Sequence, residues 1–269
     1  MTRFAATTLC LLLVVATAAV ATSGWLRWAI WSAAGGAYLI LAGLGIAFIR
    51  MRFFADAVCR GTPGCKQVAL TFDDGPDSSV TPALLDLLDE LGVKATFFCV
   101  GCHAREHPDV ARQIVARGHL VGNHSLEHQW WLNFRRSGFL RRQIELAQDA
   151  IASVTGTRPV YYRPPCGLTN PHTNKALRPL LLKLVGWDVQ ALDQYTADPQ
   201  TIIRRIMRGA RDGSIIVLHD GQTSRQALLQ AVRAIVSQLR QRGYTLVGLD
   251  RLLGDNIHKQ AGSAAKSSP

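Results

Sequence analysis

The chain has 269 residues and a formal net charge of +11, with 30 lysines and arginines against 19 aspartates and glutamates. This length accommodates one large domain plus an appendage. The positive charge suits anionic lipid headgroups or a phosphorylated, lipid-linked substrate, and it equally suits helix surfaces kept soluble by arginine. Because no basic–aromatic recognition motif accompanies the charge, we expect no nucleic-acid partner.

Residues 1–60 are predicted to form an N-terminal membrane anchor. Two apolar segments, residues 4–21 and 29–49, are each long enough to span or nearly span a bilayer. Arg27 is the only charged residue between residues 4 and 49, and three tryptophans surround the break between the segments, where indole rings favour the membrane interface. The pattern therefore predicts a membrane hairpin.

A cleavable signal peptide is the alternative for the first segment. Arg3 supplies a basic start, and Ala19-Val20-Ala21 is a small-residue cleavage site. Arg50 and Arg52 directly follow the second segment, which agrees with the positive-inside rule. We therefore predict a protein anchored in a membrane of the bacterial inner-membrane type, with its main domain facing the cytoplasm and an outward-facing domain as the alternative.

The six cysteines form neither a zinc-site pattern nor a disulfide framework. Cys59 and Cys65 can close a small loop if oxidised, and Cys99 and Cys102 have C-x-x-C spacing. Reduced thiols are the preferred interpretation, which weakly favours the cytoplasm.

Residues 61–254 alternate short apolar runs with amphipathic stretches, and residues 255–269 are predicted to be a disordered tail. The expected strands are 68–72, 96–100, 119–122, 161–163, 184–189, 214–218 and 245–247. The expected helices are 81–91, 108–117, 140–154, 174–183, 201–209 and 225–242. Repeated β-then-α units imply an α/β fold in which a parallel sheet is covered by helices, either closed as a barrel or doubly wound.

Polar residues follow the carboxyl ends of five different predicted strands. They are the Asp73-Asp74 pair, His124, Arg163, Asp193 and His219. Parallel strands in a barrel present these ends on one face, where catalytic groups gather. The sequence therefore predicts that these side chains share one site.

The adjacent carboxylates Asp73 and Asp74 end a hydrophobic strand and are followed by Gly75-Pro76. Two charges at such a position need a cationic partner. The alternative is a strand-end turn in which one aspartate caps the next helix.

His124 and His128 have i, i+4 spacing, so on a helical turn both imidazoles point the same way and can bind one divalent ion. The alternative is a polar loop that enters a helix. Together with Asp74 they form a His-His-Asp set with open positions, which suits Zn²⁺ or another first-row metal such as Co²⁺, Ni²⁺ or Mn²⁺.

Asp73 then becomes the general base toward a metal-bound water, and Arg163 pairs with this carboxylate and orients it. The alternative for Arg163 is a purely structural ion pair. The loop that follows holds Pro164, Pro165 and Gly167. These residues stiffen the backbone, so that the N–H of Cys166 can point toward a developing oxyanion.

His219 is a candidate general acid at the end of a very apolar strand, although a lone histidine there is often only a satisfied strand-end residue. A general acid must be protonated near neutral pH, so a neighbouring carboxylate should raise its pKa. Asp193 and Asp220 are the two candidates for that carboxylate.

Four ordered motifs resemble those of the polysaccharide deacetylases, the NodB-homology domain of carbohydrate esterases. They are Thr71-Phe72-Asp73-Asp74-Gly75-Pro76, His124-Ser125-x-x-His128, Arg163-x-Pro165-x-Gly167 and Leu218-His219. The resemblance covers about Lys66 to Leu253. It implies a distorted (β/α) barrel and metal-dependent hydrolysis of an N-acyl amino sugar, or less often of an O-acyl ester.

By motif match, the resemblance implies a role for each site residue. Asp73 is the base, Asp74, His124 and His128 bind the metal, and His219 is the acid. Arg163 steadies Asp73, and Asp193 tunes His219.

The sequence departs from the family pattern at three positions. Cys166 stands where the third motif often has an aromatic residue, Gln194 where tryptophan is common, and Val217 two residues before the histidine where leucine is usual. These positions shape the acyl pocket and its rim.

We therefore expect a metal-dependent N-deacetylase acting on an amino sugar in a polysaccharide, chitooligosaccharide or lipid-linked glycan. One alternative is a deformylase or deacetylase of a polyprenyl-phosphate-linked amino sugar at the cytoplasmic leaflet. The other is a catalytically silent glycan-binding protein on the same scaffold.

Overall fold

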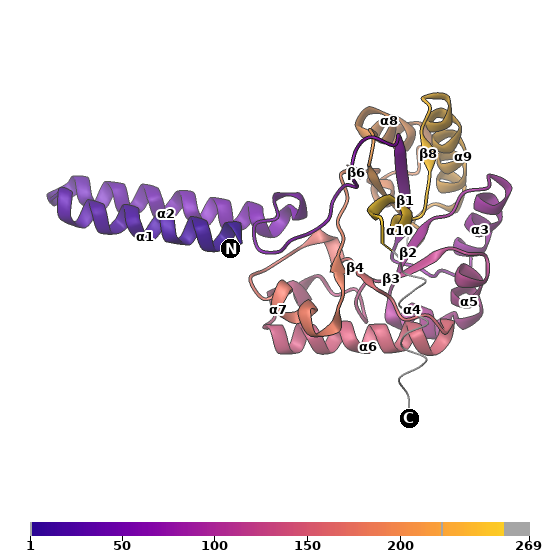
Figure 1. The fold of residues 1–269 in the computed structure, drawn as a ribbon, viewed down its shortest axis with the longest axis horizontal. Coiled ribbons are helices and arrows are strands. Elements are labelled where there is room, and N and C mark those ends of the chain that lie inside the picture. Colours follow the sequence, from indigo (N-terminus) through magenta and orange to yellow (C-terminus); the bar gives the residue numbers. More distant parts are fainter. Residues whose placement is uncertain (1, 222, 256–269) are drawn as a thin grey trace.

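The structure is a computed structural model that describes residues 2–221 and 223–255. Its N-terminal part is a hairpin of two apolar helices, α1 (Arg3–Ala21) and α2 (Gly24–Ala47), which projects from the rest of the molecule (Figure 1). Both helices are long and apolar enough to cross a membrane by length and composition. The second helix begins at Gly24, five residues before the segment predicted from the sequence, so Arg27 lies within it.

The remaining chain builds a curled parallel sheet covered by helices, which confirms the predicted distorted (β/α) barrel. The strands are β1 (Gln67–Asp73), β2 (Thr96–Cys99), β3 (Leu120–Asn123), β4 (Tyr161–Tyr162), β5 (Lys183–Leu184), β6 (Val189–Gln190), β7 (Ile215–His219) and β8 (Thr245–Leu246). The order across the sheet is β5-β4-β3-β2-β1-β7-β6, and β8 pairs with the start of β1. All of these pairs are parallel.

Helices cover the outer face of this sheet (Figure 1). They are α3 (Thr81–Glu90), α4 (Gly101–Glu106), α5 (Pro108–Ala116), α6 (Ser137–Thr155), α7 (Thr173–Leu177), α8 (Pro199–Gly209) and α9 (Arg225–Gln241). The last helix, α10 (Leu249–Leu253), instead adds Leu249 and Leu252 to the cluster inside the barrel. Short 3₁₀ turns occur at Ile49–Met51, Trp130–Phe134, Pro165–Gly167, Arg178–Leu180 and Asp193–Tyr195. Leu84, Leu85 and Leu88 bury the apolar face of α3 against the sheet.

The predicted strand over residues 184–189 is wrong, because this segment forms two strands at opposite edges of the sheet. β5 pairs with β4 and β6 pairs with β7, so residues 185–188 cross from one edge to the other. Two-residue strands are too short for a period-2 pattern to resolve.

The predicted helix over 174–183 is also wrong in extent, since α7 ends at Leu177. Pro179 lacks a backbone N–H and its ring clashes with the preceding turn of an α-helix, so the chain continues as a 3₁₀ turn and then as β5. The short helices α4 and α10 were not predicted. Residues 256–269 of the predicted tail lie outside the described residues.

Strand alternation determines which side chains enter the barrel. On β1, Val68, Leu70 and Phe72 pack against the helices, so the alternate residues Thr71 and Asp73 point inward. The interior cluster contains Phe98, Tyr161 and Val247, among others, and it underlies the polar end of the barrel.

Candidate active site

Asp73 lies inside the barrel at the carboxyl end of β1, directly beside His219 on β7 in the register of the two strands. Its Oδ1 accepts a hydrogen bond from Nη1 of Arg163 at 2.6 Å, and the same Nη1 also donates to Thr71 at 2.8 Å. The Arg163 guanidinium lies 4.0 Å from the centroid of the Phe98 ring. Arg163 is fully buried, so it orients Asp73 from inside the barrel rather than from solvent.

Asp74 turns away from the barrel interior toward two histidines. Its backbone has a φ of +74°, a left-handed conformation that is uncommon for a non-glycine residue and that gives two adjacent aspartates different directions. Its Oδ1 lies 3.3 Å from Nε2 of His124 and 3.1 Å from Nε2 of His128. The two carboxylates therefore have different partners: Asp73 contacts Arg163, and Asp74 contacts the two imidazoles.

These three side chains fit a divalent metal ion. Asp74 Oδ1 is buried without a hydrogen-bond partner among the described residues, although it faces two ring nitrogens. The Nδ1 of His124 lies 2.8 Å from the carbonyl oxygen of Arg163, an arrangement that assigns the proton to Nδ1 and leaves Nε2 free to bind a metal. In a tetrahedral site with bonds of about 2.0 Å, neighbouring donor atoms are about 3.3 Å apart, close to the distances seen here.

The electrostatics of the cluster agree with a cation at its centre. Burial alone would raise the pKa of Asp74, but the adjacent His124 imidazole outweighs it and holds this pKa well below its ordinary value. Burial opposes protonation of His124, yet the carboxylates of Asp73 and Asp74 outweigh that effect and raise its pKa. Burial, with the neighbouring His124, lowers the pKa of His128 to about 4, so this imidazole is a neutral donor near pH 7.

His219 pairs with Asp193 and not with Asp220. The Nδ1 of His219 lies 2.9 Å from Asp193 Oδ1, and the other carboxylate oxygen accepts the backbone N–H of His219 at 2.8 Å. Burial opposes a charged imidazole, but this pairing outweighs it and raises the pKa of His219. Asp220 instead accepts a hydrogen bond from the Thr81 hydroxyl at 2.6 Å.

Burial raises the pKa of Asp220 to about 7, and the charge of the nearby Asp74 adds to this effect. The described hydrogen bond of this carboxyl group goes to Thr81, whereas His219 bonds to Asp193.

The two aspartates, the two histidines of the cluster and His219 line one cavity of about 130 Å³. It is lined by Asp73, Asp74, His124, His128, Cys166, Gly167, Trp187, Gln190, Gln194, Tyr195, Val217 and His219. Asp74, His128 and Cys166 all have positive φ values, although none is glycine. Such backbone strain clusters at functional sites, where the surrounding structure holds it in place.

Cys166 is an exposed lining residue with a φ of +55° in the turn between Pro165 and Gly167. Gln194 and Val217, the other two departures from the family pattern, also line the cavity. The three positions at which this sequence departs from the family pattern therefore line the same cavity.

Sequence reasoning missed several residues that position the site. The Nδ1 of His103 on α4 lies 2.8 Å from the Asp74 carbonyl oxygen. The Asn123 side chain accepts the Ser125 N–H at 2.9 Å and donates to a carbonyl oxygen of α6, which holds the turn that carries His124. Trp187 closes one wall of the cavity. Only Asn123 had a signal in the sequence, as a polar residue at a strand end.

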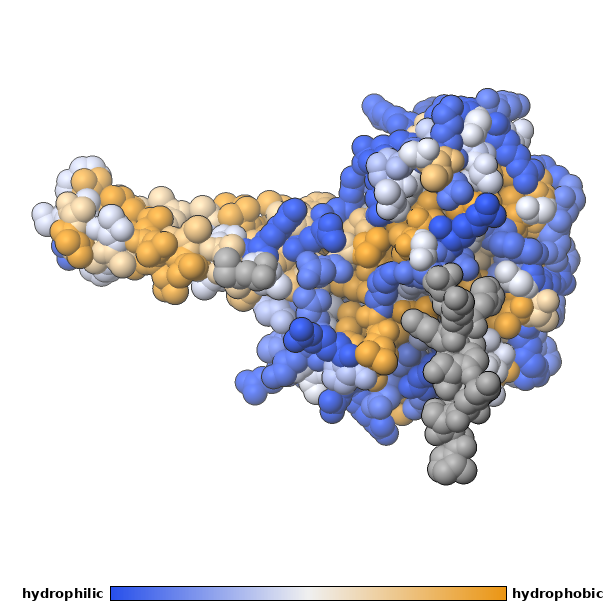
Figure 2. Space-filling view, in the orientation of Figure 1, coloured by the Kyte–Doolittle hydropathy of each residue, from blue (hydrophilic) through white to orange (hydrophobic). Residues whose placement is uncertain are grey.

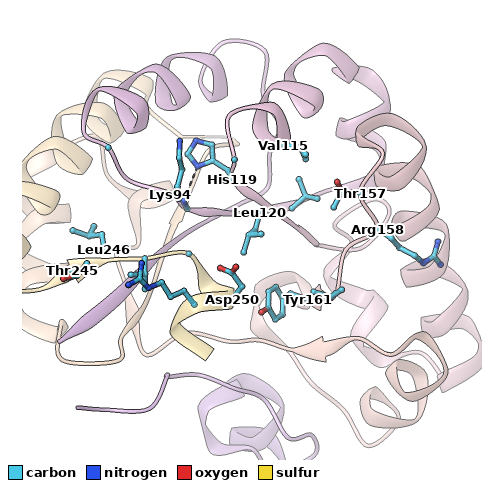
Figure 3. A pocket seen from close by; sticks show the side chains of 18 residues that line it. Lys94, Val115, His119, Leu120, Thr157, Arg158, Tyr161, Thr245, Leu246 and Asp250 are labelled. Carbon is cyan, nitrogen blue, oxygen red and sulfur yellow. Dashed lines mark hydrogen bonds between the residues drawn. The ribbon is translucent and has the colours of Figure 1, made fainter. Parts of the chain in front are cut away.

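A larger cavity of about 620 Å³ lies at the amino ends of the strands, at the other end of the barrel (Figure 3). Lys94, His119, Arg158 and Asp250 are among its lining residues. Within the described part of the chain, the one cluster suited to a metal ion is Asp74–His124–His128. Because catalytic groups of such barrels gather at the carboxyl ends of the strands, the smaller cavity is the candidate active site.

The family of the chain follows from comparison with known proteins. Residues 60–185 match the family model described as Polysaccharide deacetylase. A chitooligosaccharide deacetylase of Azorhizobium caulinodans is 34% identical over 199 residues, covering 70% of this chain and 94% of that protein. The chain belongs to the polysaccharide deacetylase family.

A peptidoglycan-N-acetylglucosamine deacetylase of Listeria monocytogenes is 34% identical to this family member over 192 residues. The match covers 71% of this chain but 40% of that relative, so the chain spans about two fifths of the length of the first relatives that it matches.

Solved structures agree with this polysaccharide deacetylase fold. A peptidoglycan N-acetylglucosamine deacetylase has a TM-score of 0.70 at 30% identity, covering 74% of this chain and 93% of that chain. A CE4 family pseudoenzyme from Bacillus anthracis has a TM-score of 0.69 at 27% identity, covering 73% of this chain and 68% of that chain. One of these structures is a pseudoenzyme, so a shared fold does not by itself establish activity. The activity of this chain depends on the residues of its site.

Proposed function

We propose that this chain is a metal-dependent hydrolase that removes an N-acyl group, such as acetyl, from an amino sugar in a glycan. The observation that carries the proposal is the convergence of three pairings on one cavity. Asp74 meets His124 and His128, Asp73 meets Arg163, and Asp193 meets His219. The related proteins, a chitooligosaccharide deacetylase and peptidoglycan deacetylases, support the substrate class.

In this proposal, Asp74, His124 and His128 hold a divalent metal, with Zn²⁺ the first candidate. When bound, such an ion polarises the acyl carbonyl and lowers the pKa of water. Asp73, held by Arg163, takes a proton from the attacking water. The backbone N–H of Cys166 donates to the carbonyl oxygen as negative charge develops on it.

His219 acts as the general acid that protonates the departing amine. Its Nδ1 is occupied by Asp193, so Nε2 is the nitrogen left to face the cavity. The Asp193 carboxylate raises the pKa of this imidazole, which favours the protonated form that the role requires.

The proposal is tested by incubating the zinc-loaded, full-length protein with N-acetylated chitooligosaccharides and following their masses. We expect the loss of whole acetyl groups, and chelation of the metal should abolish it. A protein that retains zinc but hydrolyses no acylated amino sugar would instead be a silent glycan-binding protein. The complete set of catalytic groups favours the active enzyme.

A lipid-linked amino sugar is the second candidate substrate, and the position of the hairpin favours it. The Thr169 backbone N–H and hydroxyl donate to the carbonyl oxygens of Ile46 and Gly45 near the end of α2, each at 3.3 Å. Arg50 donates to the Asp188 carbonyl oxygen at 3.1 Å. The loops that carry Gly167 and Trp187 into the cavity therefore also contact the base of the hairpin.

The hairpin suits a membrane anchor. Its 24-residue second helix is about 36 Å long, enough for a hydrocarbon core of about 30 Å. Tryptophans 25, 28 and 31 lie near its tip, and Phe4, Phe48, Phe53 and Phe54 lie at its base, as expected of residues at two membrane interfaces. Figure 2 shows it as an apolar projection from a mostly hydrophilic domain.

The cations Arg3, Arg50 and Arg52 gather at the end of the hairpin next to the domain, which favours a cytoplasmic domain. Cys65 tests this orientation, because it is exposed outside the hairpin. A membrane-impermeant maleimide should label it only after the cells are permeabilised. Labelling of Cys65 in intact spheroplasts would place the domain outside.

A further inference from the structure

Most of the large apolar side chains that are exposed on the described part of the domain beyond residue 48 lie in two neighbouring segments. Four of the five lie in two segments, residues 130–139 and 171–181, which we call the interfacial surface. They are Trp130, Phe134, Phe139 and Leu181, with exposed fractions of 61%, 61%, 44% and 89%. The fifth is Tyr195, at the cavity. An exposed cluster of this kind marks an interaction site rather than ordinary surface.

The same surface is strongly basic. Residues 128–143 and 164–187 contain no aspartate or glutamate. Arg135, Arg136, Lys175 and Arg178 are exposed there, and none of them forms an ion pair with another described residue. The guanidinium of Arg135 lies 4.9 Å from the Trp131 ring and 5.5 Å from the Phe139 ring. Arginines among exposed aromatic rings match the chemistry of an anionic lipid headgroup region.

The interfacial surface adjoins the base of the hairpin. Ile49, just after α2, shares a buried cluster with Leu140 of α6 and Leu177 of α7. The Asn170 side chain donates to the carbonyl oxygens of Asn133 and Arg135, and Thr169 beside it bonds to the end of α2. The first turn of α6 therefore lies on the hairpin side of the domain, while α3 and α9 lie on the far side (Figure 1).

We infer that the interfacial surface docks on the anionic bilayer that the hairpin enters. This inference rests on the proposed membrane anchor and adds a second, peripheral contact to it. His128 lies two residues before Trp130, and Cys166 lies three residues before Thr169. Docking of this surface therefore holds the mouth of the catalytic cavity at the level of the lipid headgroups. The substrate class that fits is an acylated amino sugar carried close to the membrane by a lipid.

The contact can be tested by photo-crosslinking of the full-length, zinc-loaded protein in nanodiscs that contain anionic lipid. A benzophenone amino acid replaces Phe134 or Phe139 in the surface. Leu39 on α2 is the membrane control, and Ser237 on the exposed side of α9 is the aqueous control. We expect lipid adducts at positions 39, 134 and 139, with at least about fivefold fewer at position 237.

Two other patterns of adducts would overturn the inference, and they show whether the docking surface or the anchor is wrong. Adducts at position 39 but not at 134 or 139 leave the anchor intact and remove the docking surface. An absence of adducts at position 39 removes the anchor, and the docking surface with it. Hydrolysis of a soluble chitooligosaccharide by the same preparations reports separately on the enzymatic proposal.

Charge reversal tests whether the exposed arginines contribute to docking of the interfacial surface on the membrane. The double variant Arg135→Glu/Arg136→Glu should lower the adduct yield at position 134 by about tenfold and leave the yield at position 39 unchanged, because it replaces two cations that face anionic headgroups with anions. The matched control is Arg204→Glu/Arg208→Glu on α8, which should change neither yield. An unchanged yield at position 134 in the first variant would overturn the assignment of these arginines.

Discussion

The guanidinium of Arg163 is fully buried between the Phe98 and Trp187 rings, and Asp73 is its anionic partner. Three further hydrogen bonds go to the Thr71 hydroxyl and to the carbonyl oxygens of Val185 and Gly186, so four of its five N–H donors are used. A buried cation with this many partners fixes the carboxylate that it contacts. It therefore couples the stability of the barrel to the geometry of the proposed base.

Replacing Arg163 with methionine should lower the free energy of unfolding by about 3–5 kcal/mol, because it leaves the Asp73 charge buried and unpaired. Urea denaturation of the detergent-solubilised protein measures this change. The control is Arg158→Met, whose ion pair with Asp149 is about half exposed and should be worth less than about 1 kcal/mol. Similar small losses for both variants would argue against a buried ion pair at Asp73.

The pairing of His219 with Asp193 predicts a pH dependence. A general acid works while it is protonated, so activity should fall as the pH rises through the pKa of His219. Asp193 raises that pKa, so Asp193→Asn should move the alkaline limb of the kcat/KM profile to lower pH. Asp198→Asn, at an exposed helix cap, should leave the limb in place. If the limb does not move in Asp193→Asn, His219 is not the titrating acid.

The sequence predicted the candidate catalytic and metal-binding residues better than the residues that hold them in position. Asp73, His124 and His219 each stand out because a polar residue ends an apolar strand. His103 and Trp187 reach the site through tertiary contacts, from a short helix and from a strand crossover that have no periodic pattern. No local signal marks such residues.

At the scale of elements, the loop after β4 and the crossover between β5 and β6 form one wall of the cavity. Gly167 has a φ of +67°, and a Cβ at this position would overlap the ring of Trp187. Glycine is therefore required both by the backbone conformation and by the close approach of the indole. The crossover itself was missed from the sequence, because its flanking strands have only two residues each.

Gly167→Ala should lower kcat/KM by about 10- to 100-fold, because displacement of Trp187 by even about 1 Å misplaces the groups of the cavity. Gly156→Ala is the matched control. That glycine also has a positive φ, +71°, but a Cβ there meets no other atom, so only the backbone cost of about 1 kcal/mol in stability is expected. Steady-state kinetics on a chitooligosaccharide separates the two variants. Equal activities would mean that the contact with Trp187 does not shape the site.

At the scale of the whole molecule, the hairpin is fixed against the catalytic domain at the loops that build the cavity. Hydropathy and arginine placement predicted two apolar segments, but not which face of the domain would meet them. That arrangement depends on Thr169, Asn170 and Ile49, whose sequence context is unremarkable in composition. This arrangement places the cavity of the proposed active site close to the membrane surface.

We propose that Asp73 moves the proton and Asp74 binds the metal, and the turnover of Asp73→Asn at measured zinc occupancy separates these two roles. We predict that this variant binds zinc like the wild type and loses at least about 100-fold in kcat, since a general base contributes about 10²–10⁴-fold. Asp74→Asn should instead lose zinc. Substantial hydrolysis by fully zinc-loaded Asp73→Asn would show that Asp73 is not the general base.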